Sequence, residues 1–342
     1  MNKSEENKYI INTAVRFYRN VENTPFVSKF TVDDADDINY NVKNVCDGLW
    51  NEGKYDIINI NNARKNDLLY WCDENCCSIK TEPTKHERFI YEDRDNICSV
   101  ITNEAEHIMV QAKVDEYDVN ATYKRACETI NALSERIPFA VSDKYGFLTA
   151  NPWCSGTGLK VAVFMHMPAS ALTNAFAKFS DGLKTRGIGI TAFYPDKRKL
   201  LSPFYHLTNL YTRNVTEEEV IENIAHAVNE VVEFEEERRS ELIGNRRNFV
   251  YDIVYRSIGI MALAWELDIS QFLLSMSNLR LAGELGIIDI DMDYADELLL
   301  KGQIGYIKRY KERNLIDPEE NDDVVRARIL REETAPILKK LL

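Results

Sequence analysis

A glycine-rich segment at residues 151–160 carries the residue types best suited to bind a charged ligand. It reads Asn-Pro-Trp-Cys-Ser-Gly-Thr-Gly-Leu-Lys and leads into an apolar run. Glycines let the backbone approach a ligand closely, and the ammonium group of Lys160 could meet a phosphate. A structural turn before a buried strand would have the same composition. The segment therefore predicts either a phosphate site or a turn.

Seven cysteines raise the question of a metal or disulfide site. The densest group is Cys72, Cys76 and Cys77, and no second Cys or His pair lies at the spacing of a zinc finger. The scattered positions and the odd count favour free thiols. We therefore expect no bound metal.

The charge balance narrows the classes of partner. The 342-residue chain has 42 Lys+Arg against 55 Asp+Glu, a net charge of −13, and is 45% hydrophobic. Nucleic-acid recognition needs a basic face, which this balance disfavours. No apolar run approaches the ~18 residues of a membrane helix, and the polar start does not resemble a signal sequence. We expect a cytoplasmic protein that binds neither nucleic acid nor membrane.

The first part of the chain alternates between strand and helix patterns. Apolar or alternating runs predict strands at 97–101, 107–112, 159–167, 187–194 and 207–211. Residues 119–136 have apolar side chains at helical spacing. Thr216 and Glu219 form a capping box before a long amphipathic helix. These patterns predict an α+β domain whose antiparallel or mixed sheet is flanked by helices.

The last hundred residues show little strand character. Helices are expected at 249–267, 269–285 and 294–313, with Gly286 ending one of them and Pro318 opening a last charged helix. We therefore place a domain boundary near residue 245. It separates an α+β domain at 1–245 from an all-helical domain at 246–342.

Segments along the whole chain resemble motifs of guanidino kinases, especially the bacterial protein-arginine kinases. Residues 151–160 resemble Cys-Pro-Thr-Asn-x-Gly-Thr-Gly-x-Arg, 12–20 resemble Ser-Ser-Arg-x-Arg-Leu-Ala-Arg-Asn, and 103–109 resemble Asn-Glu-Glu-Asp-His-Leu-Arg. Residues 205–209 resemble Tyr-Gln-Ile-Ser-Asn, and 255–260 and 279–287 resemble tail motifs of the protein-arginine kinases. The resemblance is weakest over 30–95. It implies the guanidino-kinase catalytic fold, a helical dimerisation and regulatory domain, and ATP with Mg²⁺ as cofactors.

The resemblance also implies a cage of arginines around the transferred phosphoryl group. Such transfer builds charge on a planar, metaphosphate-like group, which cations and magnesium stabilise. Arginine suits this role because its forked donors bind phosphate oxygens bidentately. Here family arginines fall on Ala14, Met109 and Lys160, whereas Arg16 stays in place. Lys160 could still attract a phosphate as a point charge.

The segment 187–210 leaves two alignments open. An ungapped match puts Thr191 where another phosphate-binding arginine belongs and Asp196 where the catalytic loop glutamate belongs. If the loop carries an insertion, Arg186 takes the place of that arginine. Arg16, Lys160 and Arg186 are therefore the candidate phosphate-binding residues, and Asp196 is the candidate catalytic residue.

The guanidinium-binding positions are altered as well. The second substrate carboxylate of the family falls on Ala105, and the cysteine beside the guanidinium falls on Asn151, with Cys154 three residues further on. Glu104 and Glu106 flank Ala105. If 107–112 is a strand, neighbouring positions point to opposite faces, so neither glutamate projects as the missing residue would. We expect solvated or structural roles for both.

The tail carries an altered form of a second family motif. Residues 322–327, Asp-Asp-Val-Val-Arg-Ala, resemble the Arg-Asp-x-x-Arg-Ala motif that binds phosphoarginine. An acid replaces the first arginine and would repel a phosphate. Asp323 and Arg326 are thus a remnant of the reader site. Arg326 is expected to be a solvent or interface residue, and its family position leaves a phosphate ligand as the alternative.

These changes favour a pseudokinase that binds or regulates a partner. The expected partner is a second copy of the chain, an active protein-arginine kinase, or that kinase's adaptor and protease machinery. One alternative is a divergent active ATP:guanidino phosphotransferase that rebuilds the cage with Lys160, Arg186, Lys197, Arg198 and Lys199. Another is a nucleotide sensor that binds without turnover through Arg16 and Lys160.

Overall fold

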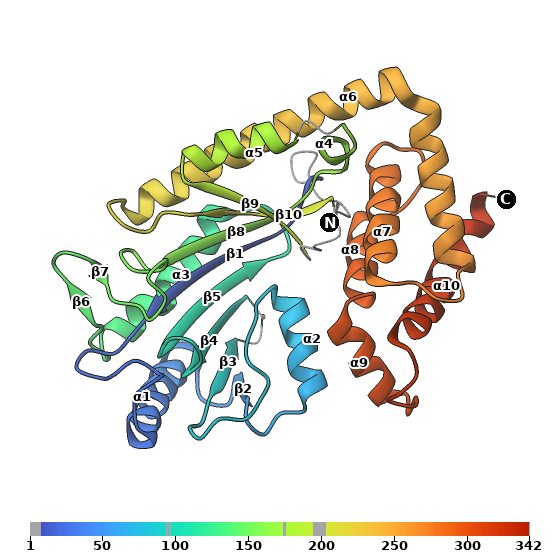
Figure 1. The fold of residues 1–342 in the computed structure, drawn as a ribbon. Helices are drawn as coiled ribbons and strands as arrows, with labels where there is room; N and C mark the ends of the chain where they lie inside the picture. The colour runs from blue at the N-terminus through green and yellow to red at the C-terminus, as the bar shows by residue number, and fades with distance from the viewer. Residues whose placement is uncertain (1–7, 94, 96, 174–175, 194–202, 342) are drawn as a thin grey trace.

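The computed structural model describes residues 8–341 apart from 94, 96, 174–175 and 194–202. Its strands are β1 (Ile10–Arg19), β2 (Tyr55–Asn59), β3 (Phe89–Asp93), β4 (Cys98–Thr102), β5 (Ile108–Val114), β6 (Val141–Ser142), β7 (Gly146–Phe147), β8 (Leu159–His166), β9 (Ile188–Ala192) and β10 (Phe204–Asn209). Among the described residues, eight of them form one antiparallel sheet in the order β2-β3-β4-β5-β1-β8-β10-β9, and β6 pairs with β7 (Figure 1).

The helices fall into two groups. They are α1 (Val32–Trp50), α2 (Lys65–Asn75), α3 (Val119–Ser134), α4 (Pro168–Leu172), α5 (Phe176–Thr185), α6 (Glu217–Leu263), α7 (Ile269–Glu284), α8 (Met292–Lys301), α9 (Ile304–Arg313) and α10 (Asp322–Leu341). The elements from α7 onward form a helical tail beside one end of the sheet (Figure 1). The predicted α+β class with a helical C-terminal region is confirmed.

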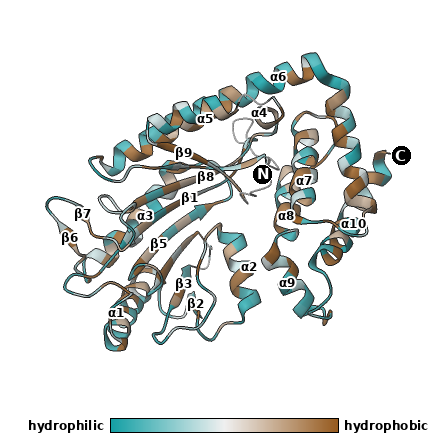
Figure 2. Cartoon of the chain, viewed as in Figure 1, coloured by the Kyte–Doolittle hydropathy of each residue, from teal (hydrophilic) through white to brown (hydrophobic). Residues whose placement is uncertain are grey.

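One face of the sheet is covered by helices and forms the larger core. Side chains from the central strands, such as Val15 and Val161, pack against α3 through Leu133 and against α6 through Val231. Thr216 and Glu219 form the expected capping box at the start of α6. Figure 2 shows apolar residues concentrated on the strands and polar residues on the outer faces of the helices. On the opposite face, α2 packs against β3, β4 and β5, and the rest of that face, called the open face, lies toward the tail (Figure 1).

The sequence patterns did not predict the central strand, β1. Strands predicted at 97–101, 107–112, 159–167, 187–194 and 207–211 correspond to β4, β5, β8, β9 and β10 within a few residues. β1, which lies between β5 and β8, was not predicted. Its Asn12, Thr13 and Arg16 interrupt the apolar alternation, although Asn12 and Thr13 are buried in the fold.

α6 runs through both parts of the molecule. It is 47 residues long and is broken at Arg246, where φ is −137° and ψ is 35°. Residue 245, near which the sequence predicts a domain boundary, lies within this helix next to its kink, and the boundary stays a prediction. The helix expected at 294–313 is two helices, α8 and α9, and the last helix begins at Asp322 rather than at Pro318. No helix among the described residues is long and apolar enough to cross a membrane.

A buried ionic cluster joins the sheet to the tail. The side chain of Glu284, at the end of α7, is fully buried, and its carboxylate lies 2.6 Å from Arg239 Nη1 on α6 and 3.3 Å from Arg280 Nε. Its Oε1 is 3.2 Å from Nδ1 of His166, which ends β8. Glu235 completes the cluster by accepting hydrogen bonds from Arg239 and from the first backbone N–H groups of α4.

The charge of this carboxylate is stabilised by its partners. Burial alone would raise the pKa of Glu284, but Arg239, the hydrogen-bonded His166 and Arg280 lower the pKa to about 2 from its ordinary value of 4.5. A carboxylate whose folded pKa is depressed stabilises the fold above its unfolded pKa, and this contribution is lost as the pH falls toward the folded pKa.

We predict that Glu284→Gln lowers the free energy of unfolding by about 3–5 kcal/mol at pH 7, because it leaves buried arginines without their shared counter-charge. Urea denaturation measures the change. Glu237→Gln is the control, because the ion pair of Glu237 with Arg238 lies at the surface. It should change the free energy of unfolding by no more than about 0.5 kcal/mol.

The difference between wild type and Glu284→Gln should narrow as the pH falls from 4.5 toward 2, since in that window the unfolded wild-type chain takes up a proton on this carboxylate while the folded protein keeps it ionised. A difference that stayed constant down to pH 3 would contradict the assignment of the charge to Glu284.

Candidate active site on the open face of the sheet

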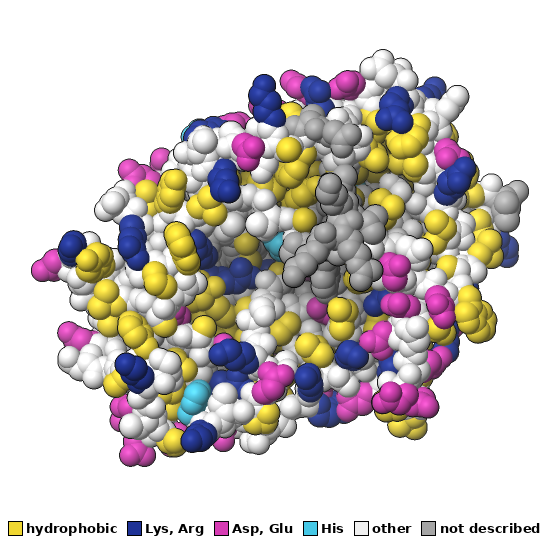
Figure 3. Space-filling view, in the orientation of Figure 1, with side chains coloured by type: hydrophobic (Ala, Val, Ile, Leu, Met, Phe, Trp, Pro, Cys, Tyr) yellow, Lys and Arg dark blue, Asp and Glu magenta, His cyan; other side chains and the backbone are white. Residues whose placement is uncertain are grey.

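Strand register brings the predicted cations together. Arg16 on β1 lies opposite Gln111 on β5 and opposite Lys160 on β8. Directly opposed residues of antiparallel strands project from the same face. Arg16, Gln111 and Lys160 therefore share the open face, and His206 and Thr191 on the next strands project from the same side. Figure 3 shows basic side chains on the floor of the hollow over this face.

Arg16 is already bound within the chain. Its Nε donates to Gln111 Oε1 at 2.5 Å, and its Nη2 donates to the carbonyl of Cys76 at 2.7 Å. Gln111 in turn donates to the carbonyl of Asn75 at 3.1 Å. The carboxyl-terminal end of α2 thus takes up hydrogen-bond donors that a bound anion would need.

Lys160 is bound in the same way. Its Nζ donates to the carbonyls of Asn209 at 3.0 Å and Leu210 at 3.4 Å. Burial lowers the pKa of Lys160, which Cys154 partly offsets. His206 adds no charge at neutral pH, because burial and the nearby Arg16 lower its pKa to about 4.

The glycines of residues 151–160 contact the chain itself. A Cβ on Gly156 (φ +109°) would lie 1.9 Å from the carbonyl oxygen of Thr212, and one on Gly158 (φ +62°) would lie 2.3 Å from Nη1 of Arg19. Both positions need glycine for close internal packing. Of the two predictions for this segment, the contacts favour the structural turn that leads into β8.

A cavity of about 290 Å³ lies beside Arg16. Its walls are Arg16, Tyr18, Cys76, Cys77, Ser78, Ile79, Glu104, Ala105, Glu106, Met109, Asn151 and Cys154. It therefore gathers the positions that correspond to the guanidinium site, together with the segment that follows α2. Burial raises the pKa of both Cys77 and Cys154, so both thiols are protonated at neutral pH.

The two glutamates of this cavity have structural partners. Glu106 is buried and accepts hydrogen bonds from Asn20 Nδ2 and from the backbone N–H groups of Ala150 and Asn151. Glu104 accepts from Arg88 at 3.1 Å and from the Lys80 N–H at 2.7 Å. These contacts agree with the structural role expected for both.

The strand predicted at 107–112 does not extend back to the two glutamates. Residues 103–107 form a turn before β5 rather than the start of the strand. Asn103 has a positive φ of 58°, and its N–H donates to the His107 carbonyl at 2.9 Å. Strand alternation therefore does not determine where Glu104 and Glu106 point.

Met109 belongs to an apolar cluster instead of a cation cage. It is 9% exposed and packs with Trp71, Ile79 and Ile101. This cluster ties α2 to β4 and β5. The position that corresponds to a family arginine therefore holds α2 against the sheet.

The remaining site candidates lie apart or outside the described residues. Arg186, at the end of α5, donates twice to Glu230 on α6, each at 2.6 Å. Because α6 covers the opposite face of the sheet, the structure does not bring Arg186 to Arg16 and Lys160. Asp196, Lys197, Arg198 and Lys199 lie outside the described residues.

Arg326 is not a solvent or interface residue, and that prediction was wrong. It is 2% exposed and donates to the carbonyls of Gly302 and Leu267, each at 2.8 Å. Its Nη1 also contacts Asp323 Oδ1 at 2.5 Å. Arg326 and Asp323 thus join α10 to the end of α8 and to the loop before α7, and the guanidinium is buried in these contacts.

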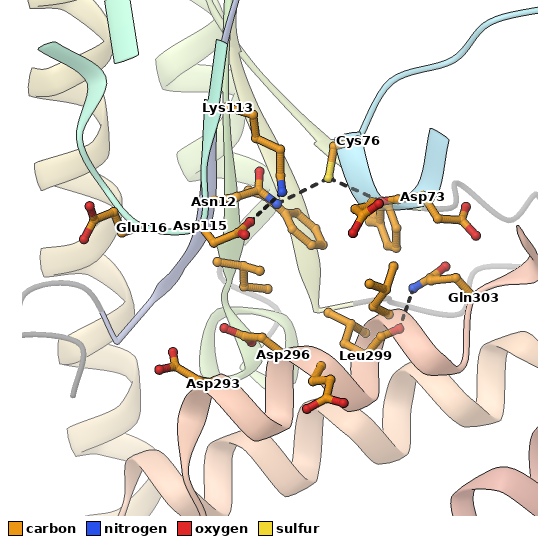
Figure 4. Close-up of a pocket in the computed structure, with 16 residues that line it drawn as sticks. Asn12, Asp73, Cys76, Lys113, Asp115, Glu116, Asp293, Asp296, Leu299 and Gln303 are labelled. Atoms are coloured by element: carbon orange, nitrogen blue, oxygen red, sulfur yellow. Dashed lines mark hydrogen bonds and ion pairs between the residues drawn. The ribbon is translucent and has the colours of Figure 1, made fainter. Parts of the chain in front are cut away.

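A larger cavity of about 850 Å³ lies where the sheet meets the tail (Figure 4). Its described lining contains the carboxylates of Asp73, Glu74, Asp115, Glu116, Asp293, Asp296 and Glu297, and one lysine, Lys113. Lys113 Nζ lies 2.5 Å from Asp115 Oδ1. The described residues of the open face therefore fit a nucleoside triphosphate poorly. Acidic side chains outnumber the cations, and Arg16, Lys160 and Lys113 each have a partner within the chain.

Sequence reasoning missed the part played by α2. The family resemblance is weakest over this region. α2 contributes through backbone carbonyls, which every residue type has, so the sequence does not indicate them. The signal that could have pointed there is the cluster of Cys72, Cys76 and Cys77, which was weighed as a metal site and interpreted as free thiols. Among the described residues no group of His, Cys, Asp and Glu could hold a metal ion.

Comparisons with known proteins agree with this architecture. Residues 37–238 match the family model of the ATP:guanido phosphotransferase C-terminal catalytic domain, and residues 247–340 match that of the protein-arginine kinase McsB C-terminal domain. The protein-arginine kinase of Clostridium acetobutylicum is 27% identical over 96% of this chain and 96% of its own. That of Clostridium novyi is 28% identical over 97% of this chain and 96% of its own.

Solved structures show the same fold. Lombricine kinase has a TM-score of 0.60 at 15% identity and covers 70% of this chain and 69% of its own. The duplicated taurocyamine kinase from Schistosoma mansoni has a TM-score of 0.60 at 21% identity, covering 66% of this chain and 33% of that longer chain. With a family model that matches more than half of its residues, this chain belongs to the ATP:guanido phosphotransferase family.

Proposed function

We propose that this protein is a protein-arginine-kinase-like pseudokinase that acts by binding or regulating a partner. The observation that carries this proposal is that both candidate phosphate-binding cations of the open face already donate hydrogen bonds to the chain itself. Arg16 binds the Cys76 carbonyl, and Lys160 binds the carbonyls of Asn209 and Leu210. Met109 supports it further, because an apolar cluster occupies the place of a cation.

The number of missing cationic side chains supports loss of efficient phosphotransfer. Removing one electrostatic donor to a transition state costs roughly 3 kcal/mol, or about 10²- to 10³-fold in rate. Ala14, Met109 and Thr191 each lack such a donor, and Lys160 lacks the fork of an arginine. Such losses are not additive, but together they leave little catalysis.

The proposed partner is a protein, and the proposed location is the cytoplasm. A second copy of the chain, an active protein-arginine kinase, or the adaptor and protease machinery of that kinase each remain candidate partners. The match of residues 247–340 to a protein-arginine kinase tail supports this class of partner.

A divergent active phosphotransferase is the second candidate function. The observation that favours it is that Cys154 and Arg16 line one cavity, so a guanidinium and a phosphate could meet there. In that case Asp196 would be the catalytic residue, with Lys197, Arg198 and Lys199 supplying charge beside ATP and Mg²⁺. A nucleotide sensor that binds through Arg16 and Lys160 is the third.

We predict no transfer of radiolabel from Mg²⁺-ATP to free arginine or to arginine-containing protein above the background without enzyme. An active protein-arginine kinase assayed in parallel is the positive control. Turnover at a kinase-like rate that Asp196→Asn or Lys160→Ala abolished would refute the proposal and establish the second candidate.

Calorimetry with ATP or ADP should show no saturable binding below millimolar concentration, because binding must first break the internal contacts of Arg16 and Lys160. Tight binding to wild type that Lys160→Ala weakens would instead support the nucleotide sensor.

We predict that Met109→Arg destabilises the protein by about 2–4 kcal/mol, since it places a charged group in the apolar cluster of α2. Met109→Leu is the control and should cost less than about 1.5 kcal/mol. Thermal denaturation measures both. A stable Met109→Arg variant that gained phosphotransfer would show that the cage had been merely interrupted.

A further inference from the structure

α2 connects the candidate site to the helical tail. At its carboxyl-terminal end, the carbonyls of Asn75 and Cys76 accept hydrogen bonds from Gln111 and Arg16. The last carbonyls of a helix carry the negative end of its dipole. The end of α2 therefore offers Arg16 a partial negative charge of the kind that an anionic ligand would offer.

The tail holds the other side of α2. Asp73 Oδ2 accepts a hydrogen bond from the N–H of Gly305 at 2.6 Å, at the first turn of α9. α9 has no side-chain cap of its own, since its N-cap residue Gln303 makes no such bond. Burial raises the pKa of Asp73 to about 6, against the lowering effect of the Gly305 N–H. Asp73 thus caps a tail helix from within the sheet domain.

The two helices pack closely where this cap forms. A Cβ on Gly305 would lie 2.3 Å from the carbonyl carbon of Leu69 and 2.5 Å from the nitrogen of Tyr70, so only glycine fits. The Arg309 guanidinium lies 4.0 Å from the centre of the Tyr70 ring and 3.0 Å from Asp67 Oδ1. Figure 1 shows α2 between the sheet and α9.

The segment after α2 completes the arrangement. Residues 76–79 form one wall of the cavity of about 290 Å³ beside Arg16. Asn12 Nδ2 also contacts Cys76 Sγ at 3.3 Å, which fixes this wall to β1. Movement of α2 away from the sheet would free the Arg16 fork and widen the cavity in one step.

We propose that the contact between α2 and α9 is autoinhibitory: the tail holds the terminal carbonyls of α2 on Arg16, in the place of an anionic ligand that carries phosphate groups. The inference rests on the proposed role of Arg16 as an anion-binding residue. It does not depend on whether phosphotransfer is lost.

The proposal has a thermodynamic consequence. A phosphate and the Cys76 carbonyl compete for one guanidinium. The apparent affinity for the anion is therefore the intrinsic affinity multiplied by the fraction of molecules in which α2 is released. Linkage requires the reverse effect as well: a bound anion makes the contact between α9 and α2 less stable. A partner that binds the tail and moves α9 would therefore change the affinity at Arg16.

The test uses the full chain with Gly305→Ala, which wedges the two helices apart, and inorganic pyrophosphate as the anion. Amide hydrogen exchange of residues 65–75 should become faster, and calorimetry should show about tenfold tighter pyrophosphate binding than in wild type. Gly259→Ala is the matched control, because a Cβ there meets nothing within 4 Å, and it should change neither measurement.

A second substitution tests whether the gain in pyrophosphate affinity depends on Arg16. Arg16→Gln in the Gly305→Ala background should remove the gain in affinity, and a gain that persisted would overturn the proposal. Arg309→Gln loosens the same contact without a wedge and covers the case in which Gly305→Ala does not fold. Faster exchange of α2 with unchanged pyrophosphate affinity would also overturn the proposal, as would unchanged exchange in both variants. None of these outcomes bears on the phosphotransfer assay, which alone judges the pseudokinase assignment.

Discussion

The buried carboxylate of Glu284 fixes how the helical tail meets the sheet. It lies on α7 and is bound by Arg239 from α6 and by Arg280 within its own helix, next to His166 at the end of β8. A buried charge is tolerated only where its partners surround it, so this cluster allows little change in the relative placement of these elements. α8 and α9 follow α7 along the chain, and α9 contacts α2, which the apolar cluster around Met109 also holds to the sheet.

The open face of the sheet shows how a binding surface can keep its cations and still be neutralised. Arg16, Lys160 and Lys113 all remain there, but each is bound by a carbonyl or carboxylate of the same chain. The larger cavity beside them is lined mainly by acids. Counting basic residues along a motif therefore overstates the positive field that a ligand would meet.

Local patterns predicted a large part of the fold, because they reflect local physics. The capping box of Thr216 and Glu219 and the apolar run of β8 appear where the sequence places them. The motif match also put Arg16 and Lys160 on one surface, and the register of β1 and β8 brings them together.

Contacts made by the backbone, or by charged groups in buried places, could not be predicted in the same way. The carbonyl of Cys76 has no signature in the sequence. Arg326 sits in a charged helix that looks solvated, yet its partners are carbonyls from α8 and from the loop before α7, far away along the chain. The single helix α6 has a related consequence for folding: it contributes Val231 to one core and Val254 to the other, on opposite sides of the kink at Arg246, so loss of either core exposes half of this helix and weakens the support that it gives to the other core.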